Sequence, residues 1–236
     1  AVGNWGTVLT GSSIAVDAGW NMLSLPVTPT YVTQQLNFPD LLVFDYSNTY
    51  RHLSTTDTLT PGHGFWVKFN SAKNHFISGT ELPSVTVNLK AGWNMFGGPD
   101  HSMATPSGND IISQIWGYSP AGYQQSVTLQ PGKSYWVRVA RDTSITFGTA
   151  VSTKTALEME KIENTITVSD KLGRRQTLYV VESAGHTMNL DQYLLPPIPP
   201  QESFDVRFRS GRMIEVLPAS SGEAKSVRYP ILLQSP

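Results

Sequence analysis

Apolar and polar residues alternate over many short stretches in the N-terminal part of the chain, which is the pattern of β-strands with one buried face. Residues 14–17 and 87–90 each alternate an apolar residue with a small or polar one. In the stretches 65–69 (FWVKF) and 135–139 (YWVRV), the first, third and fifth residues fall on one strand face and the tryptophan on the other. The pattern predicts an all-β fold.

The same blocks of sequence occur twice and in the same order. Residues 18–26 read AGWNMLSLP, and residues 91–99 read AGWNMFGGP. Two further blocks and one tyrosine align in the same way: FDYS at 44–47 with WGYS at 116–119, LTPGHGFWV at 59–67 with LQPGKSYWV at 129–137, and Tyr50 with Tyr123. Repetition of this kind indicates two copies of one structural unit. We predict two tandem small β-sandwich or barrel repeats, over residues 1–82 and 83–154.

The composition changes near residue 154, and the part that follows contains none of the six tryptophans. Residues 165–181 predict a hairpin around a turn at 170–173. Because the prolines of 195–200 (LPPIPP) have no backbone donor, this stretch is expected to be an extended connector. Three further strands are predicted at 204–208, 213–216 and 229–233. We therefore predict an immunoglobulin-like β-sandwich over residues 155–236, and we expect it to lack its last piece.

The composition argues against several classes of function. The chain has no cysteine, which excludes disulfides, cysteine-ligated zinc and a cysteine nucleophile. The net charge is −1 and no basic stripe is present, so we expect no nucleic-acid partner. No apolar run is long enough for a membrane helix, and we expect no membrane insertion. The sequence does not open with a signal peptide, so Ala1 is expected to be a boundary inside a longer protein.

Two groups of motifs resemble parts of known bacterial proteins. The repeated GWN…P and PGxx[FY]WV blocks resemble tandem β modules near the C-terminal ends of large secreted bacterial proteins. The block from Leu195 to Gly211, LPPIPP…FDVRF…G, resembles the domain that precedes the sorting tail of type IX secretion substrates in Bacteroidetes, Chlorobi and related phyla. These resemblances cover nearly the whole chain. They imply a secreted or cell-surface location and a non-catalytic role.

The sequence contains no recognisable catalytic constellation. Serine-hydrolase elbows, zinc-protease helices and glycine-rich phosphate loops are all missing. The five histidines, at positions 52, 63, 75, 101 and 186, do not have the spacing of metal ligands. We expect no enzyme activity, no cofactor and no metal site, while calcium bound through loop aspartates stays open.

The repeated aromatic residues are the candidate binding residues. Exposed tryptophan and tyrosine rings can stack on the apolar faces of sugars, and the same rings can equally form the core of a small module. Trp66 and Trp136 share a strand face with Lys68 and Arg138, so we expect these two tryptophans to be the more exposed ones. Together with Tyr50 and Tyr123 they form the predicted ligand-binding set.

The GWN motif itself favours a structural interpretation. Gly19 and Gly92 lie where a strand turns, and a positive φ is expected there. Asn21 and Asn94 are expected to hydrogen-bond nearby backbone groups, which accounts for their repetition without a ligand.

From these features we predict a non-catalytic accessory or scaffolding region of a larger secreted or cell-surface bacterial protein. Its expected partners are neighbouring domains of the same polypeptide. The alternative is a carbohydrate-binding region attached to a polysaccharide-degrading enzyme, with a polysaccharide as the partner of the exposed rings.

Overall fold

The computed structural model describes residues 10–30, 38–45, 49–54, 57–148, 164–182, 189–217 and 226–236. Within these ranges the chain is all-β, as predicted, and its one helical element is the short 3-10 helix η2 (Leu190–Tyr193). We refer to described residues up to 82 as the first segment, to 83–148 as the second segment and to 164–236 as the third segment. The sequence predicts a short linker at residues 149–156, and these residues lie outside the described ranges.

The first segment consists of two small sheets. Its strands are β1 (Gly11–Val16), β2 (Gly19–Leu23), β3 (Thr28–Pro29), β4 (Asp40–Asp45), β5 (Thr49–His52), β6 (Phe65–Phe69) and β7 (Lys73–Thr80). One sheet has the order β1-β7-β3 and the other β2-β6-β4-β5. Because β1 runs directly into β2, and β6 into β7, the two sheets are joined at a corner and enclose a core that includes Ile14, Phe65 and Ile77.

The second segment has a closely similar arrangement. Its strands are β8 (Val85–Leu89), β9 (Gly92–Gly97), β10 (Met103–Ala104), β11 (Trp116–Ser119), β12 (Gly122–Gln125), β13 (Thr128–Leu129), β14 (Ser134–Val139) and β15 (Thr143–Phe147). They form the sheets β15-β8, β10-β13 and β12-β11-β14-β9. The core of this segment includes Val87, Tyr135 and Phe147.

The two segments pair their motif strands in the same register. Strand β2 lies antiparallel to β6 with Met22 opposite Trp66, and β9 lies antiparallel to β14 with Met95 opposite Trp136. The first, third and fifth residues of FWVKF and YWVRV all enter the core of their own segment, as the alternation predicts.

The structure corrects one part of the sequence alignment. Leu42 of β4 lies opposite Trp66, and Trp116 of β11 lies opposite Trp136, so Leu42 and Trp116 are the equivalent residues. Phe44 is therefore equivalent to Tyr118, and not to Trp116 as the block alignment predicts. A shift of two residues leaves every side chain on the same face, so the period-2 pattern does not reveal it.

The third segment contains two further sheets. Its strands are β16 (Asn164–Ser169), β17 (Arg175–Glu182), β18 (Asp205–Phe208), β19 (Ile214–Leu217) and β20 (Ile231–Gln234). Strands β16 and β17 form the predicted hairpin, β19 pairs parallel to β17, and β18 pairs with β20. Residues 195–200 lie between η2 and β18 without forming a strand, as their prolines predict.

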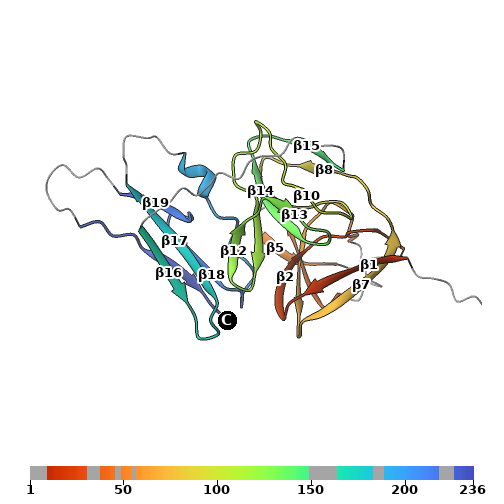
Figure 1. Ribbon diagram of the computed structural model, residues 1–236, viewed down its shortest axis with the longest axis horizontal. Helices are drawn as coiled ribbons and strands as arrows, with labels where there is room; N and C mark the ends of the chain where they lie inside the picture. Colours follow the sequence, from red (N-terminus) through yellow and green to blue (C-terminus); the bar gives the residue numbers. More distant parts are fainter. Residues whose placement is uncertain are drawn as a thin grey trace, which may run out of the picture.

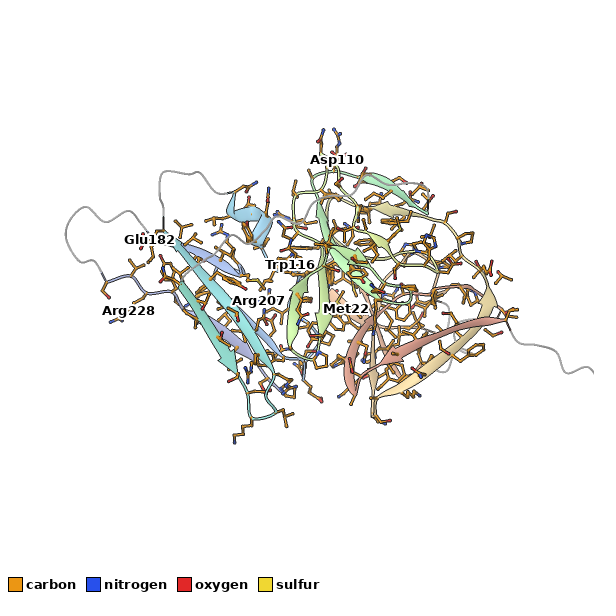
Figure 2. All side chains as sticks on the ribbon, viewed as in Figure 1. Met22, Asp110, Trp116, Glu182, Arg207 and Arg228 are labelled. Carbon is orange, nitrogen blue, oxygen red and sulfur yellow. The ribbon has the colours of Figure 1, made fainter. Side chains whose placement is uncertain are left out.

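The first and second segments lie against each other, and the third packs against both. Figure 1 shows β12 of the second segment facing β17 and β18 on one side, while β2 of the first segment lies on its other side. Met22, Trp116 and Arg207, one residue from each segment, lie near the centre of the molecule, while Asp110, Glu182 and Arg228 lie at its margins (Figure 2).

Candidate functional site

The repeated aromatic residues meet at the place where the three segments join, which we call the junction. The junction is a continuous apolar cluster formed by residues of all three segments: Trp20, Met22 and Trp66 from the first, Met95, Trp116, Tyr123 and Trp136 from the second, and Leu178, Val180, Leu195, Phe204, Val206, Phe208, Met213 and Ile214 from the third. It is separate from the inner cores of the first and second segments.

The first and second segments contact each other reciprocally at the junction. Phe44 packs edge-on against Trp136, with ring centroids 4.7 Å apart. Tyr118, the equivalent of Phe44, packs in the same way against Trp66 at 4.8 Å. Each segment thus inserts the same aromatic position against the tryptophan of the other, which is the arrangement of a self-complementary two-fold interface.

The backbone contacts between these segments are reciprocal as well. Leu23 forms an isolated bridge with Lys133, and Phe96 forms one with His63. The amide of Ser24 donates to the Gly132 carbonyl at 3.0 Å, and the amide of Gly97 donates to the Gly62 carbonyl at 3.0 Å.

Gly62 and Gly132 of the two Pro-Gly turns also lie against the first strand of the other segment. A Cβ on Gly132 would meet the Ile14 side chain at 2.7 Å, and one on Gly62 would meet that of Val85 at 2.8 Å. Only glycine permits this approach.

The expectation that Trp66 and Trp136 are exposed is wrong. Both are 0% exposed, and Trp93 of the GWN motif is less buried than either. The alternation places these two indoles outside the core of their own segment, but the opposite strand face is covered by the other segments rather than by water. Lys68, on the same face as Trp66, reaches the edge of the junction and pairs with Glu202 at 2.7 Å.

The two tyrosines of the predicted binding set lie in the same interior. Tyr123 is 1% exposed and its hydroxyl donates to the Pro197 carbonyl at 2.8 Å. Tyr50 is partly buried beside Trp66 and Tyr123. The structure therefore brings Trp66, Tyr50 and Tyr123 together and places Trp136 against Phe44 and Trp93. These rings pack against one another and offer no open platform.

The glycine and asparagine of the GWN motif behave as the sequence predicts. Gly19 and Gly92 have φ values of 89° and 100°. The Asn94 side chain accepts from the Lys90 amide at 2.9 Å and donates to the carbonyls of Lys90 and Gly92 at 2.7 and 2.9 Å. Asn21 makes the equivalent three hydrogen bonds. The motif therefore builds the corner at which one sheet turns into the next.

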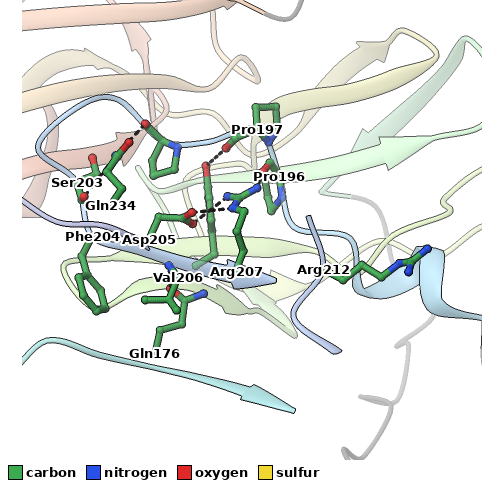
Figure 3. Close-up of polar contacts among 12 residues, drawn as sticks. Gln176, Pro196, Pro197, Ser203, Phe204, Asp205, Val206, Arg207, Arg212 and Gln234 are labelled. Carbon is green, nitrogen blue, oxygen red and sulfur yellow. Dashed lines mark hydrogen bonds and ion pairs between the residues drawn. The ribbon is translucent and has the colours of Figure 1, made fainter. Parts of the chain in front are cut away.

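Side chains of other elements hold the proline connector in place (Figure 3). Arg207 donates from Nη1 to the Pro196 carbonyl at 2.8 Å, and Gln234 donates from Nε2 to the Pro200 carbonyl at 2.9 Å. A proline has a backbone carbonyl but no backbone N–H, so this stretch needs hydrogen-bond donors from elsewhere and no acceptors for its own prolines. The connector is thereby fixed to β18, to β20 and, through Tyr123, to the second segment.

Arg207 also forms a buried ion pair that motif searching does not reveal. Its guanidinium donates to both carboxylate oxygens of Asp205, at 2.6 and 2.9 Å, and the two side chains are 6% and 4% exposed. Asp205 and Arg207 lie two residues apart on β18, so they share a face. The sequence does carry a signal for this pair, because the strand sequence FDVRF places an acidic and a basic residue at alternate positions between apolar ones.

Burial changes the acidity of the tyrosines at the junction. Desolvation raises the pKa of Tyr118 to about 12 and raises those of Tyr50 and Tyr123 well above their usual value. These hydroxyls therefore stay neutral at physiological pH, and those of Tyr118 and Tyr123 donate hydrogen bonds. Tyr118 donates to the Phe204 carbonyl at 3.2 Å and accepts from the Phe204 amide at 3.1 Å.

Within the described ranges, no three His, Asp or Glu residues gather as a group that could hold a metal ion. The same part of the chain has no helix with the length and apolar character needed to cross a membrane. Comparison with family models, with curated proteins and with solved structures finds no match to this chain.

Proposed function

We propose that this chain is a rigid, non-catalytic accessory region of a larger secreted or cell-surface bacterial protein. In this role it holds a neighbouring domain of the same polypeptide at a fixed distance and orientation. The observation that carries the proposal is the continuous apolar junction, to which all three segments contribute fully buried side chains. Modules joined only by linkers move relative to one another by default, and a large apolar interface removes that freedom.

The proposal includes a finer description of the fold. The first two segments are two copies of one small β module, and the third is an immunoglobulin-like sandwich whose core joins the junction. The equal strand registers and the reciprocal contacts support the two copies. Face-to-face contact between β17 and β18 supports a sandwich in the third segment. The export context comes from the resemblance of the LPPIPP…FDVRF…G block, whose connector and ion pair are fixed parts of this fold.

The test of rigidity is a distance measurement between the first and third segments. Because the chain contains no cysteine, two introduced cysteines can be spin-labelled without background. Ser71→Cys and Lys171→Cys are suitable, since both residues are exposed and lie in turns of the first and third segments. Double electron–electron resonance should give a single narrow distance distribution. A broad distribution for a folded protein would overturn the proposal.

A variant pair shows whether the junction is the cause of the rigidity. Trp136→Ala removes a fully buried indole from the junction and is expected to broaden the distance distribution and to lower the free energy of unfolding by about 3–5 kcal/mol. Val137→Ala, the next residue, removes a side chain from the inner core of the second segment. It should lower stability while leaving the distance distribution narrow.

The carbohydrate-platform alternative has no support from the four residues on which it was predicted. Sugar stacking needs a ring face open to solvent, and Trp66, Trp136 and Tyr123 are enclosed by protein on all sides.

A further inference from the structure

A cleft lies between the second and third segments, beside the junction, and Tyr123 is the one member of the predicted ligand-binding set in its lining. Its volume is 320 Å³, which is at the small end of the range for ligand sites. Residues of the β11–β12 hairpin line one wall, and β17, η2 and Met213 line the other. The residues that matter below are Trp116, Gln124, Gln125, Gln176, Tyr179 and Tyr193.

Two of the side chains that line the cleft each carry a buried donor without a partner. The indole Nε1 of Trp116 and the amide Nε2 of Gln176 are inaccessible to solvent and have no hydrogen-bond partner among the described residues. The orientation of Gln176 is fixed, because its Oε1 accepts from the Val206 amide at 3.0 Å. Buried polar groups are nearly always paired, so two unpaired donors lining one cleft indicate an acceptor that the chain itself does not supply.

The wall formed by the β11–β12 hairpin also offers acceptors. Gln124 and Gln125 use their Nε2 atoms to donate to Ser119 and Gln114, at 3.2 and 2.9 Å. Among the described residues, no partner is found for the amide oxygens of these two glutamines. The cleft therefore combines unpaired donors with unpaired acceptors.

The lining of the cleft also contains two partly buried tyrosine rings and no buried charged side chain. Tyr179 and Tyr193 are half-buried and line the cleft, so each has some ring surface available. Arg175 is the only charged residue in the lining, and it is exposed. An anion or cation would lack a buried counter-charge here.

We propose that this cleft binds one neutral pyranose unit of a saccharide. Each sugar hydroxyl can donate and accept, which matches a cleft whose lining carries both unpaired donors and unpaired acceptors. The apolar face of the ring would lie against Tyr179 or Tyr193. This inference is independent of the rigid-scaffold proposal, because it concerns a ligand and not the motion of the segments.

Nuclear magnetic resonance tests the proposal at the atom concerned. The six indole N–H signals of the ¹⁵N-labelled chain are recorded, and Trp116→Phe identifies the signal of Trp116. The probes are the methyl glycosides of glucose, galactose, mannose, xylose and N-acetylglucosamine, with glucuronic acid as the anionic comparison. At least one neutral glycoside is expected to shift the Trp116 signal in a saturable way.

Two glutamine variants separate binding in the cleft from unspecific contact. Gln124→Ala removes one acceptor from an exposed position and is expected to weaken binding about ten-fold. Gln130→Ala, an exposed glutamine of the same segment that does not line the cleft, should leave the dissociation constant unchanged. A Trp116 signal that no neutral glycoside shifts, a response to glucuronic acid alone, or equal binding by both variants would overturn the proposal. None of these outcomes bears on the rigid-scaffold proposal, which is tested separately by the distance distribution of the spin-labelled chain.

Discussion

At the scale of single residues, Asn21 and Asn94 show how a repeated residue is retained for the fold. Each makes three hydrogen bonds to backbone groups of the corner that precedes it. Each side chain is buried, so water cannot replace these bonds without opening the corner. The tryptophan between Gly and Asn points to the junction, so one short motif serves both the corner and the contact between segments.

Removing the Asn94 amide should therefore be costly. Asn94→Ala is expected to lower the free energy of unfolding by about 2–3 kcal/mol, since three hydrogen bonds of about 1 kcal/mol each are lost. Asn94→Asp keeps the acceptor for the Lys90 amide but places a carboxylate beside two carbonyls, and should be at least as destabilising. Urea unfolding measures both, with Asn88→Ala, at an exposed position of β8, as the control. A loss no larger than that of the control contradicts the role of the amide.

The residues also show what the sequence could and could not predict. Strand alternation assigns Phe65 and Trp66 to opposite faces correctly, because it depends on neighbouring residues only. It does not say what covers the second face. Trp66 is covered by Tyr118, which lies 52 positions further along the chain (118 − 66). Exposure at the junction depends on such distant contacts, so the predicted binding set was assigned to the surface wrongly.

At the scale of elements, the connector 195–200 shows how a proline-rich stretch becomes a fixed part of a domain. The sequence predicts correctly that it forms no strand, because its prolines cannot donate to a sheet. It does not predict that Arg207, Tyr123 and Gln234 donate to the proline carbonyls. These donors come from three different elements, and only the fold brings them to one stretch of chain.

The Asp205–Arg207 pair of β18 should behave as a buried ion pair. Arg207→Met leaves the Asp205 carboxylate buried without its partner and is expected to cost about 3–5 kcal/mol of stability. In Asp205→Leu/Arg207→Met no charge is left unpaired, so the double variant should be more stable than Arg207→Met alone. Thermal unfolding at neutral pH compares them, with Arg209→Met as an exposed control just beyond β18. A double variant that is less stable than the single one would show that the pair is not the source of the cost.

At the scale of the whole molecule, the junction joins three segments, each with its own β-sheets, through one continuous apolar cluster. The first and second segments keep their own cores, whereas the third segment shares its core with the junction. The third segment should therefore depend most on its neighbours. The all-β class could be predicted from local patterns, but this shared core could not, because no local pattern encodes which outer faces meet.

High pH should weaken the junction through its tyrosines. Tyr118 is neutral in the folded chain up to a pKa of about 12, but it ionises near 10 once the chain unfolds. The folded state therefore binds more protons between these values, and stability falls as pH rises through this range and is intact below it. The difference between a pKa near 10 in the unfolded chain and about 12 in the folded chain corresponds to about 2–3 kcal/mol from Tyr118. Tyr50 and Tyr123, whose pKa values are also raised, add to this loss in the same direction.

Urea unfolding at a series of pH values from 9 to about 12 measures this loss. Tyr118→Phe cannot ionise at this position, so its stability should fall less steeply with pH than that of the natural chain, even though it starts lower because the hydrogen bonds to Phe204 are gone. Lysine deprotonation affects both chains equally, so the difference in slope isolates Tyr118. Equal slopes would mean that Tyr118 is open to solvent, and the junction as described would then be wrong.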